Sequence, residues 1–565
     1  MRTILPLVPR ELQGRPCPRF KGKPLVFALP MDNYPMTIAI APLPTRRDDL
    51  LARLAQPYQY DLAVIGGGAT GLGVALDAAA RGFSVVLVDS HDFAKGTSSR
   101  ATKLVHGGVR YLAQGNIALV REALHERTTL LHNAPHLAQP LPFVMPSYRF
   151  WETPFYGIGL MVYDALAGKA GLGATEFLGR ARTLQCLPTA RTEHLKGGVK
   201  YWDGQFDDAR LALALARTAA SLGALVVNYC PARSLVHEAG KVVGFVCEDA
   251  GSGQQFTVRA RSVVNATGVW VDTLRQMDGE AIGRPVKPMV APSQGVHIVV
   301  DREFLPSDHA LMVPKTADGR VLFAVPWLGK LILGTTDSPR QDVVREPEPF
   351  RDEVRFILEE SARYLTRAPR VEDIRSIWVG LRPLVKPQDD DGDNTKKISR
   401  EHTVLASRSG LITVTGGKWT TYRAMAEDVL QKCFTTGQLP EKPAGVTNDL
   451  PLVGAPREPV RHRISEAQGL HSYGSEAAAV QQIPGAQTDL GGGLTEAMVR
   501  FAARCEYACT VEDVLARRSR LLFLDARKAM GLAPVVAGIL REELGRDPQL
   551  DAFLALARQY LHVPV

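Results

Sequence analysis

The part of the chain that most constrains its fold is residues 60–111. A short apolar run typical of a strand leads into three glycines with G-x-G-x-x-G spacing, at Gly66, Gly68 and Gly71. An Ala- and Leu-rich segment with helical spacing follows at 69–81. The first glycine allows a tight turn, the second lets a pyrophosphate approach the backbone, and the third lets helix and strand pack closely. The pattern predicts a dinucleotide-binding βαβ unit whose helix N-terminus faces phosphates.

An acidic residue completes this unit. Residues 84–88 are predicted to form the second strand, and Asp89 closes it about 20 residues after the glycines. A carboxylate at that position accepts hydrogen bonds from ribose hydroxyls. A lone glycine motif is weak evidence, but strand, glycines, helix, strand and acid in register indicate a nucleotide site.

The next segment, 96–111, indicates which nucleotide is bound. It reads GTSSRATKLVHGGVRY, whereas a nicotinamide-binding domain would continue with another strand and helix. Small, hydroxylated residues and paired glycines can run along a flavin and donate N–H and O–H groups to it; the alternative is a polar surface loop. The candidate FAD ligands in it are Thr97, Ser98, Ser99, Lys103, His106 and Gly107.

Two later segments are expected to return to the same nucleotide. A strand at 261–265 ends in Ala-Thr-Gly at Gly268. A strand that meets Gly416 and Gly417 starts a helix, and that N-terminus can stabilise the negative charge of reduced flavin. Gly268 and Gly417 are therefore further candidates for FAD binding, which we expect to be noncovalent.

The sequence resembles a known family at these motifs. GGGATGLG and GTSSRATKLVHGGVRYL look like the FAD-dependent glycerol-3-phosphate dehydrogenases that pass electrons to quinone. The resemblance covers roughly 58–540 and is also strong at GTTD, GLRPL and GGKWTTYR. Two departures are Asp89, where the family often has Glu, and QGVH, where a Gly-Ser-His type sequence is expected.

The resemblance implies oxidation of sn-glycerol 3-phosphate to dihydroxyacetone phosphate, with hydride passing from C2 to flavin N5. A phosphate dianion needs cations, and Arg offers a bidentate fork. His297 is the candidate base because its ordinary pKa suits proton transfer, and Arg382 is expected to stabilise the developing oxyanion. The candidate substrate-binding residues are Arg110, Tyr111, Lys418 and Arg400. For each of these, the alternative is a structural ion pair or core residue.

The expected fold is α/β: a Rossmann-like FAD-binding domain, an antiparallel-sheet substrate domain and a C-terminal helical domain. We predict a flexible N-terminal extension at 1–56, with a short helix near 48–55 and no signal peptide. The predicted FAD-binding domain is discontinuous and comprises 57–135, 196–285 and 401–435. The predicted substrate domain is inserted in it at 136–195 and 286–400. A C-terminal helical domain is predicted at 440–565.

The composition indicates which classes of binding partner the protein can have. The 565 residues carry a net charge of +8, and the seven cysteines show no C-x-x-C spacing, so neither a disulfide framework nor a metal site is predicted. The positive charge suits an anionic substrate or an anionic membrane surface, and no nucleic-acid-binding motif accompanies it. Residues 140–173 are apolar and aromatic but interrupted; we interpret them either as core or as a surface that meets lipid or quinone.

We therefore expect a peripheral protein at the cytoplasmic face of the inner membrane or in the cytoplasm, with glycerol 3-phosphate and membrane quinone as partners and a homodimer as a possible assembly. Three alternatives stay open: an oxidase that uses oxygen, an amine or amino-acid oxidase on the same fold, and a non-catalytic FAD-binding or tRNA-modifying protein.

Overall fold

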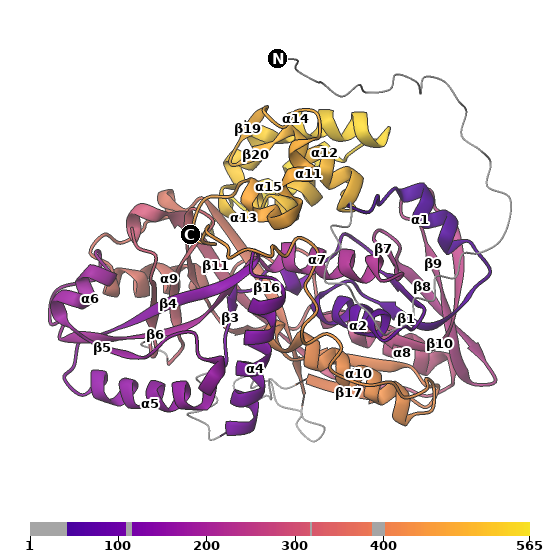
Figure 1. Cartoon of the computed structure of the whole chain (residues 1–565), viewed down its shortest axis with the longest axis horizontal. Coiled ribbons are helices and arrows are strands. Elements are labelled where there is room, and N and C mark those ends of the chain that lie inside the picture. Colours follow the sequence, from indigo (N-terminus) through magenta and orange to yellow (C-terminus); the bar gives the residue numbers. More distant parts are fainter. Residues whose placement is uncertain (1–41, 109–115, 317–318, 387–401, 565) are drawn as a thin grey trace, which may run out of the picture. The chain divides into compact units, whose positions relative to one another are not determined.

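The computed structural model describes residues 42–108, 116–316, 319–386 and 402–564. Two large sheets organise this part of the chain, and many of their strands are labelled in Figure 1. The first sheet is mostly parallel and has the order β17-β18-β10-β1-β2-β7, with β9 added to β10 and β8 to β9. Its strands are β1 (Gln59–Ile65), β2 (Val85–Val88), β7 (Leu225–Val227), β8 (Ala232–Glu238), β9 (Lys241–Glu248), β10 (Gln255–Asn265), β17 (His402–Ala406) and β18 (Ile412–Gly416).

The predicted βαβ unit is confirmed. β1 and β2 pair in parallel, and β1 also pairs in parallel with β10. β2 and the last four residues of β1 are apolar and buried, as expected for strands inside a parallel sheet that is covered on both faces. The helices of this region are α1 (Arg47–Leu54), α2 (Ala69–Ala80), α7 (Asp208–Ser221), α8 (Val271–Ala281) and α10 (Tyr422–Thr435).

The second sheet is mostly antiparallel, as predicted, in the order β15-β11-β14-β13-β12-β4-β6-β3, with β16 on β11 and β5 on β6. Its strands are β3 (Leu104–Val105), β4 (Ala138–Ser147), β5 (Glu176–Gly179), β6 (Gly197–Phe206), β11 (Val290–Asp301), β12 (Ala310–Val313), β13 (Leu322–Trp327), β14 (Lys330–Gly334), β15 (Ser338–Pro339) and β16 (Ser376–Val385). The helices nearby in sequence are α4 (Ile117–Asn133), α5 (Glu152–Ala167), α6 (Arg180–Cys186) and α9 (Arg351–Tyr364).

The border between the two sheets differs from the predicted domain border. β3 and β6 belong to the antiparallel sheet, although we assigned 57–135 and 196–285 to the FAD-binding domain. The physical reason is pairing: β6 runs antiparallel to β4 over ten residue pairs, which its own alternation of residues did not reveal.

The C-terminal region is helical, as expected, but does not have a core of its own. Its elements are α11 (Ala477–Gln481), α12 (Glu496–Cys505), a π-helix (Asp513–Arg518), α13 (Leu521–Leu524), α14 (Ala526–Leu544), α15 (Leu550–Gln559) and the short pair β19 (Asp489–Gly491) and β20 (Leu494–Thr495). One hydrophobic cluster contains Phe501 and Phe523 of these helices together with Trp327 and Trp378 of the antiparallel sheet. The C-terminal helices therefore complete the core of that sheet.

The N-terminal extension was predicted to reach residue 56, and the short predicted helix is confirmed as α1. The residues around it are bonded to the rest of the chain: Arg47 pairs with Asp249, and the Thr45 amide donates to the carbonyl of Arg504 at 2.8 Å. Residues 42–56 thus pack against the folded region rather than extending from it. The six cysteines in the described residues are free.

Candidate functional site

A cavity of about 1080 Å³ extends from the glycine motif to the antiparallel sheet. Its lining comes from the carboxyl ends of β1 and β10, from the 89–108 segment, from β11 and β16, and from the loop after β18. This is where ligands bind in open α/β sheets. The volume is slightly above the usual range for ligand sites, which suits an extended ligand.

The three glycines of the motif occupy the positions that the predicted phosphate-binding turn requires. Gly66 has φ +114°, and a Cβ there would meet the Ala266 carbonyl oxygen at 2.5 Å. A Cβ on Gly71 would lie 1.9 Å from the Gly66 carbonyl oxygen. Gly68 precedes the first residue of α2 and lines the cavity. The turn therefore excludes side chains at 66 and 71 and keeps the N-terminus of α2 open to a phosphate group.

Asp89 lines the cavity at the end of β2. Its two carboxylate oxygens accept hydrogen bonds from the amide of Gly67 at 2.6 Å and the amide of His91 at 2.8 Å. Burial raises the pKa of Asp89 to about 6. The carboxylate thus ties the glycine turn to the end of β2 and still borders the space that a ribose would occupy.

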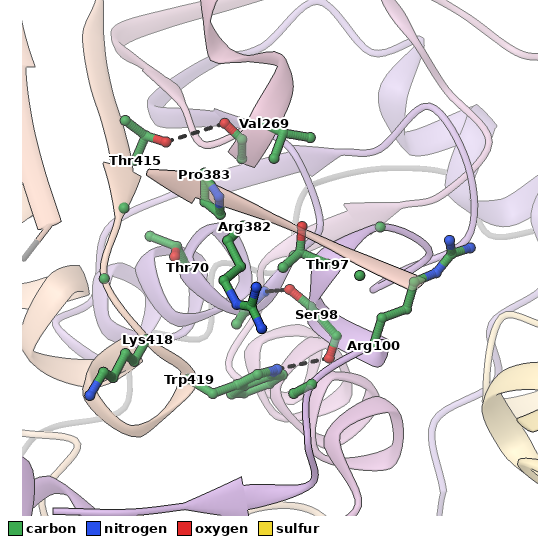
Figure 2. Close-up of a pocket in the computed structure, with 18 of the residues that line it drawn as sticks. Thr70, Thr97, Ser98, Arg100, Val269, Arg382, Pro383, Thr415, Lys418 and Trp419 are labelled. Atoms are coloured by element: carbon green, nitrogen blue, oxygen red, sulfur yellow. Dashed lines mark hydrogen bonds between the residues drawn. The ribbon is translucent and has the colours of Figure 1, made fainter. Parts of the chain in front are cut away.

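The Thr97–Ser99 turn connects several parts of the chain. The Thr97 hydroxyl donates to the Leu381 carbonyl at 2.6 Å, and the Ser98 hydroxyl accepts from the amide of Ala69 at 2.9 Å. The Ser98 carbonyl accepts from the indole of Trp419 at 2.8 Å, as Figure 2 shows. Thr97 and Ser98 line the cavity and hold the N-terminus of α2 beside the loop after β18.

Ser99 and Lys103 were predicted to contact the cofactor, but their polar contacts are with buried protein groups. The Lys103 ammonium donates to the Ser99 carbonyl and to the Asp208 carboxylate, both at 2.7 Å, and the lysine is fully buried. Burial lowers its pKa to about 7, although Asp208 opposes that shift. Sequence reasoning could not distinguish a basic residue facing the cavity from one behind it.

The other predicted FAD ligands lie near the cavity. His106, Gly268 and Gly417 line it. The amide of Gly107 donates to Asp203 at 3.4 Å, and the Gly268 carbonyl accepts from the Thr415 hydroxyl at 3.2 Å. Among the residues the structure covers, no cluster of His, Cys, Asp or Glu could hold a metal ion.

His297 lies on β11, faces the cavity and is almost fully buried. Its Nε2 is 2.9 Å from the Thr102 hydroxyl, and its ring stacks on Trp378 with centroids 4.2 Å apart. Burial lowers the pKa of His297 well below its usual value, and the charges of Lys103 and Arg382 add to the effect. The imidazole is therefore neutral at pH 7 and carries a lone pair that can accept a proton.

Arg382 of β16 also lines the cavity, and Figure 2 shows its guanidinium among the other lining side chains. It donates to the Thr336 carbonyl at 2.9 Å and to the Thr335 hydroxyl at 3.2 Å, and it pairs with Asp337 at 3.1 Å. These contacts fix the guanidinium plane, which is the preorganisation that an oxyanion-stabilising group needs.

Lys418 lines the cavity just before a short 3₁₀ turn, and in Figure 2 its ammonium points away from the Arg382 guanidinium. The structure therefore does not bring these two cations together. Arg110, Tyr111 and Arg400 lie outside the described residues, so their predicted roles stay predictions.

Sequence reasoning missed several lining residues. Thr102 contacts His297, and Asp203 accepts from Arg127 at 3.0 Å next to the Gly107 amide. Trp419 holds the Ser98 carbonyl. Thr102 lies in the 96–111 segment and Trp419 in the GGKWTTYR motif, so a hydroxyl or indole beside a predicted ligand was the available signal. Nothing in the sequence indicates that Asp203 reaches the cavity.

The residues present fit FAD. The glycine turn leaves no room for a Cβ at two positions, the N-terminus of α2 and Asp89 border the same cavity, and the Thr97–Ser98 hydroxyls adjoin them. The cavity continues to His297 and Arg382, where a ring and a substrate can meet. A nucleotide-binding domain that shares one cavity with an antiparallel sheet in this way defines a flavin-dependent oxidoreductase.

Comparison with known proteins agrees. A family model described as FAD dependent oxidoreductase matches residues 61–423, and one described as the C-terminal domain of alpha-glycerophosphate oxidase matches residues 445–550. The mitochondrial glycerol-3-phosphate dehydrogenase of Rattus norvegicus is 41% identical over 536 residues, which cover 89% of this chain and 73% of that protein. That of Arabidopsis thaliana is 39% identical over 565 residues, covering 92% and 89%.

Solved structures show the same relation. The glycerol-3-phosphate dehydrogenase from Bacillus halodurans, complexed with FAD, superposes with a TM-score of 0.72 at 28% identity, covering 92% of this chain and 98% of that one. The chain belongs to the FAD-dependent glycerol-3-phosphate dehydrogenases, and FAD is its cofactor.

Proposed function

We propose that the protein oxidises sn-glycerol 3-phosphate to dihydroxyacetone phosphate and passes the electrons to a membrane quinone. The observation that carries the proposal is the meeting of a neutral imidazole, His297, and a fixed guanidinium, Arg382, at one end of the cofactor cavity. The relatives at about 40% identity are named for this substrate.

Each residue has a distinct task in this reaction. His297 takes the proton of the substrate C2 hydroxyl, and the Thr102 hydroxyl orients its ring. Arg382 stabilises the oxygen as it gains negative charge. Lys418 and Arg110 bind the phosphate group. Bound FAD supplies the two-electron acceptor for the hydride that leaves C2.

The test is the absorbance spectrum of the purified yellow protein under anaerobic conditions. We expect glycerol 3-phosphate to bleach the flavin and glycerol to leave it oxidised at the same concentration. Unchanged absorbance with glycerol 3-phosphate, or bleaching by amino acids instead, contradicts the proposal and favours the amine-oxidase or the non-catalytic alternative.

Oxygen is the second candidate acceptor, because the C-terminal family model is described by an oxidase. Mixing the reduced protein with a soluble quinone or with oxygen separates the two. We expect reoxidation by quinone to be much faster, and faster reoxidation by oxygen would identify an oxidase.

We also propose that α5 contacts an anionic membrane surface at the cytoplasmic face of the inner membrane. Its exposed face is apolar, with Phe155 65% and Ile158 62% exposed, and the preceding Phe150 is 84% exposed. Large apolar side chains exposed together on one helix are typical of a surface that meets a membrane or another protein. The exposed Arg180 and Arg182 of α6 supply charge for anionic lipid headgroups. No helix in the described ranges is long and apolar enough to cross a membrane.

Sedimentation with anionic and with neutral vesicles tests this contact. The pair Phe155→Ser and Ile158→Ser should reduce binding to anionic vesicles, while Val535→Ser, an exposed apolar residue of α14, should not. High salt should also weaken binding. If the pair instead converts a dimer to a monomer without changing vesicle binding, the face is the interface of a homodimer.

A further inference from the structure

The C-terminal helices contact the 92–103 loop, part of which lines the cofactor cavity, through a buried arginine. Arg520 follows the π-helix, and no part of its side chain is exposed. It donates to the Ser99 carbonyl at 2.9 Å and to the Asp208 carboxylate at 3.0 Å. A residue far away in sequence thus holds the turn that carries Thr97 and Ser98.

The same two acceptors are also held from the other side by Lys103, whose ammonium donates to the Ser99 carbonyl and to Asp208. Lys103 and Arg520 both have left-handed backbones, with φ of +66° and +59°. Non-glycine residues adopt this conformation at a cost in free energy, and it persists where the surroundings require it. Two strained residues converge on one carbonyl directly behind the cavity.

A second contact of the same kind lies at the start of the loop. Arg517 and Arg518 of the π-helix both bond to Asp92, three residues after Asp89. Glu512 accepts two hydrogen bonds, at 2.7 and 2.6 Å, from the ammonium of Lys95, which lines the cavity. A π-helix is rare and tends to occur at functional sites. Here it places two consecutive arginines, Arg517 and Arg518, within hydrogen-bonding distance of the Asp92 carboxylate.

These contacts are poor candidates for stabilisation alone, because burying ion pairs often stabilises a protein no better than apolar packing does. What these C-terminal residues share is a target: Arg520, Arg517, Arg518 and Glu512 each bond to a residue of the 92–103 loop. We propose that the C-terminal helical region is part of the FAD site and that Arg520 is a positioning residue. It holds the Thr97–Ser99 turn against the N-terminus of α2, where the Ser98 hydroxyl meets the Ala69 amide. The inference concerns FAD and is independent of which substrate is oxidised.

The test measures FAD release from the holoenzyme. Free flavin fluoresces, so the rate follows from dilution at a temperature at which circular dichroism shows the variant folded. Arg520→Met should release FAD about tenfold faster or more, and Arg520→Lys should recover part of the loss because an ammonium can keep one bond. The visible circular dichroism of the bound flavin should change in Arg520→Met.

The matched control is Arg500→Met, which removes an arginine that pairs with Glu496, Glu542 and Glu543 within the same helices. It should lower the melting temperature without changing FAD release. Glu512→Gln changes a less buried contact and should speed release about threefold to tenfold; if Arg520→Met does not fold, this variant decides. Wild-type release rates in the folded Arg520 or Glu512 variants, or equal acceleration by Arg500→Met, overturn the proposal.

Discussion

The cofactor half and the substrate half of the cavity are built in different ways. The cofactor half uses the backbone of neighbouring residues, and its shape depends on missing side chains at Gly66 and Gly71. The substrate half uses side chains from strands far apart in sequence, and the antiparallel register places His297 opposite Trp378. The first half should therefore fail when atoms are added, and the second half when a charge or a hydrogen bond is removed.

The largest effect is expected from adding atoms to the cofactor half. Gly68→Leu places a side chain where the pyrophosphate approaches the N-terminus of α2, so the protein should purify almost without flavin. The ratio of flavin to protein absorbance measures this. Gly531→Ala in α14, where a Cβ meets nothing within 4 Å, is the control and should keep full flavin content. A yellow Gly68 variant would show that the pyrophosphate lies elsewhere.

Removing the fixed guanidinium from the substrate half should have the next largest effect and leave FAD bound. Arg382→Lys keeps a positive charge but loses the fork that Thr336 and Asp337 hold in place. We expect kcat to fall by about 10²–10³-fold. Arg375→Lys, just before the same strand and paired with Asp301, should leave kcat unchanged. If the Arg382 variant instead lost flavin and kept its kcat, Arg382 would belong to the cofactor half, and the two halves would not be separate.

The same difference explains what the sequence could predict. The βαβ unit, Gly66, Gly71 and Asp89 were predictable because a local backbone requirement leaves a pattern within about 30 residues. The antiparallel sheet was predictable as a type, but not the inclusion of β6, which depends on its pairing with β4. Whether Lys103 faces the cavity depends on Asp208 and Arg520, and such distant partners leave no local pattern.

Loss of a phosphate contact should raise KM more than it lowers kcat. Lys418→Met or Arg110→Met removes a charge-assisted contact worth about 1.5–3 kcal/mol, which raises KM for glycerol 3-phosphate roughly ten- to a hundredfold. The preference for glycerol 3-phosphate over glycerol should shrink by a similar factor. Lys528→Met, at an exposed position of α14, is the matched control. An unchanged preference in either variant removes that residue from the phosphate site.

The smallest expected effect is on the pH dependence of folding stability. The sign of this effect differs between His297 in the substrate half and Asp89 in the cofactor half. His297 has a pKa well below its ordinary value in the folded protein, whereas the unfolded chain has a pKa of about 6.5. Above that pH the imidazole is neutral in both states. Below it the unfolded chain takes up a proton that the folded protein does not, so stability falls as the pH falls. Asp89, whose pKa burial raises to about 6, acts in the opposite direction.

His297→Phe keeps a ring against Trp378 but has no group to protonate. The wild type should therefore lose about 2 kcal/mol more stability than the variant between pH 7 and pH 5, because about 1.4 kcal/mol is lost per pH unit below 6.5. Denaturant unfolding of both holoenzymes at several pH values measures the difference, and the other titrating groups cancel. His136 lines a different pocket, and burial lowers its pKa to about 3, so the wild type should also lose more stability than His136→Phe between pH 7 and pH 5. A difference between wild type and His297→Phe that stays constant with pH would mean that the imidazole takes up its proton at the same pH in the folded protein and in the unfolded chain, so burial would not lower its pKa.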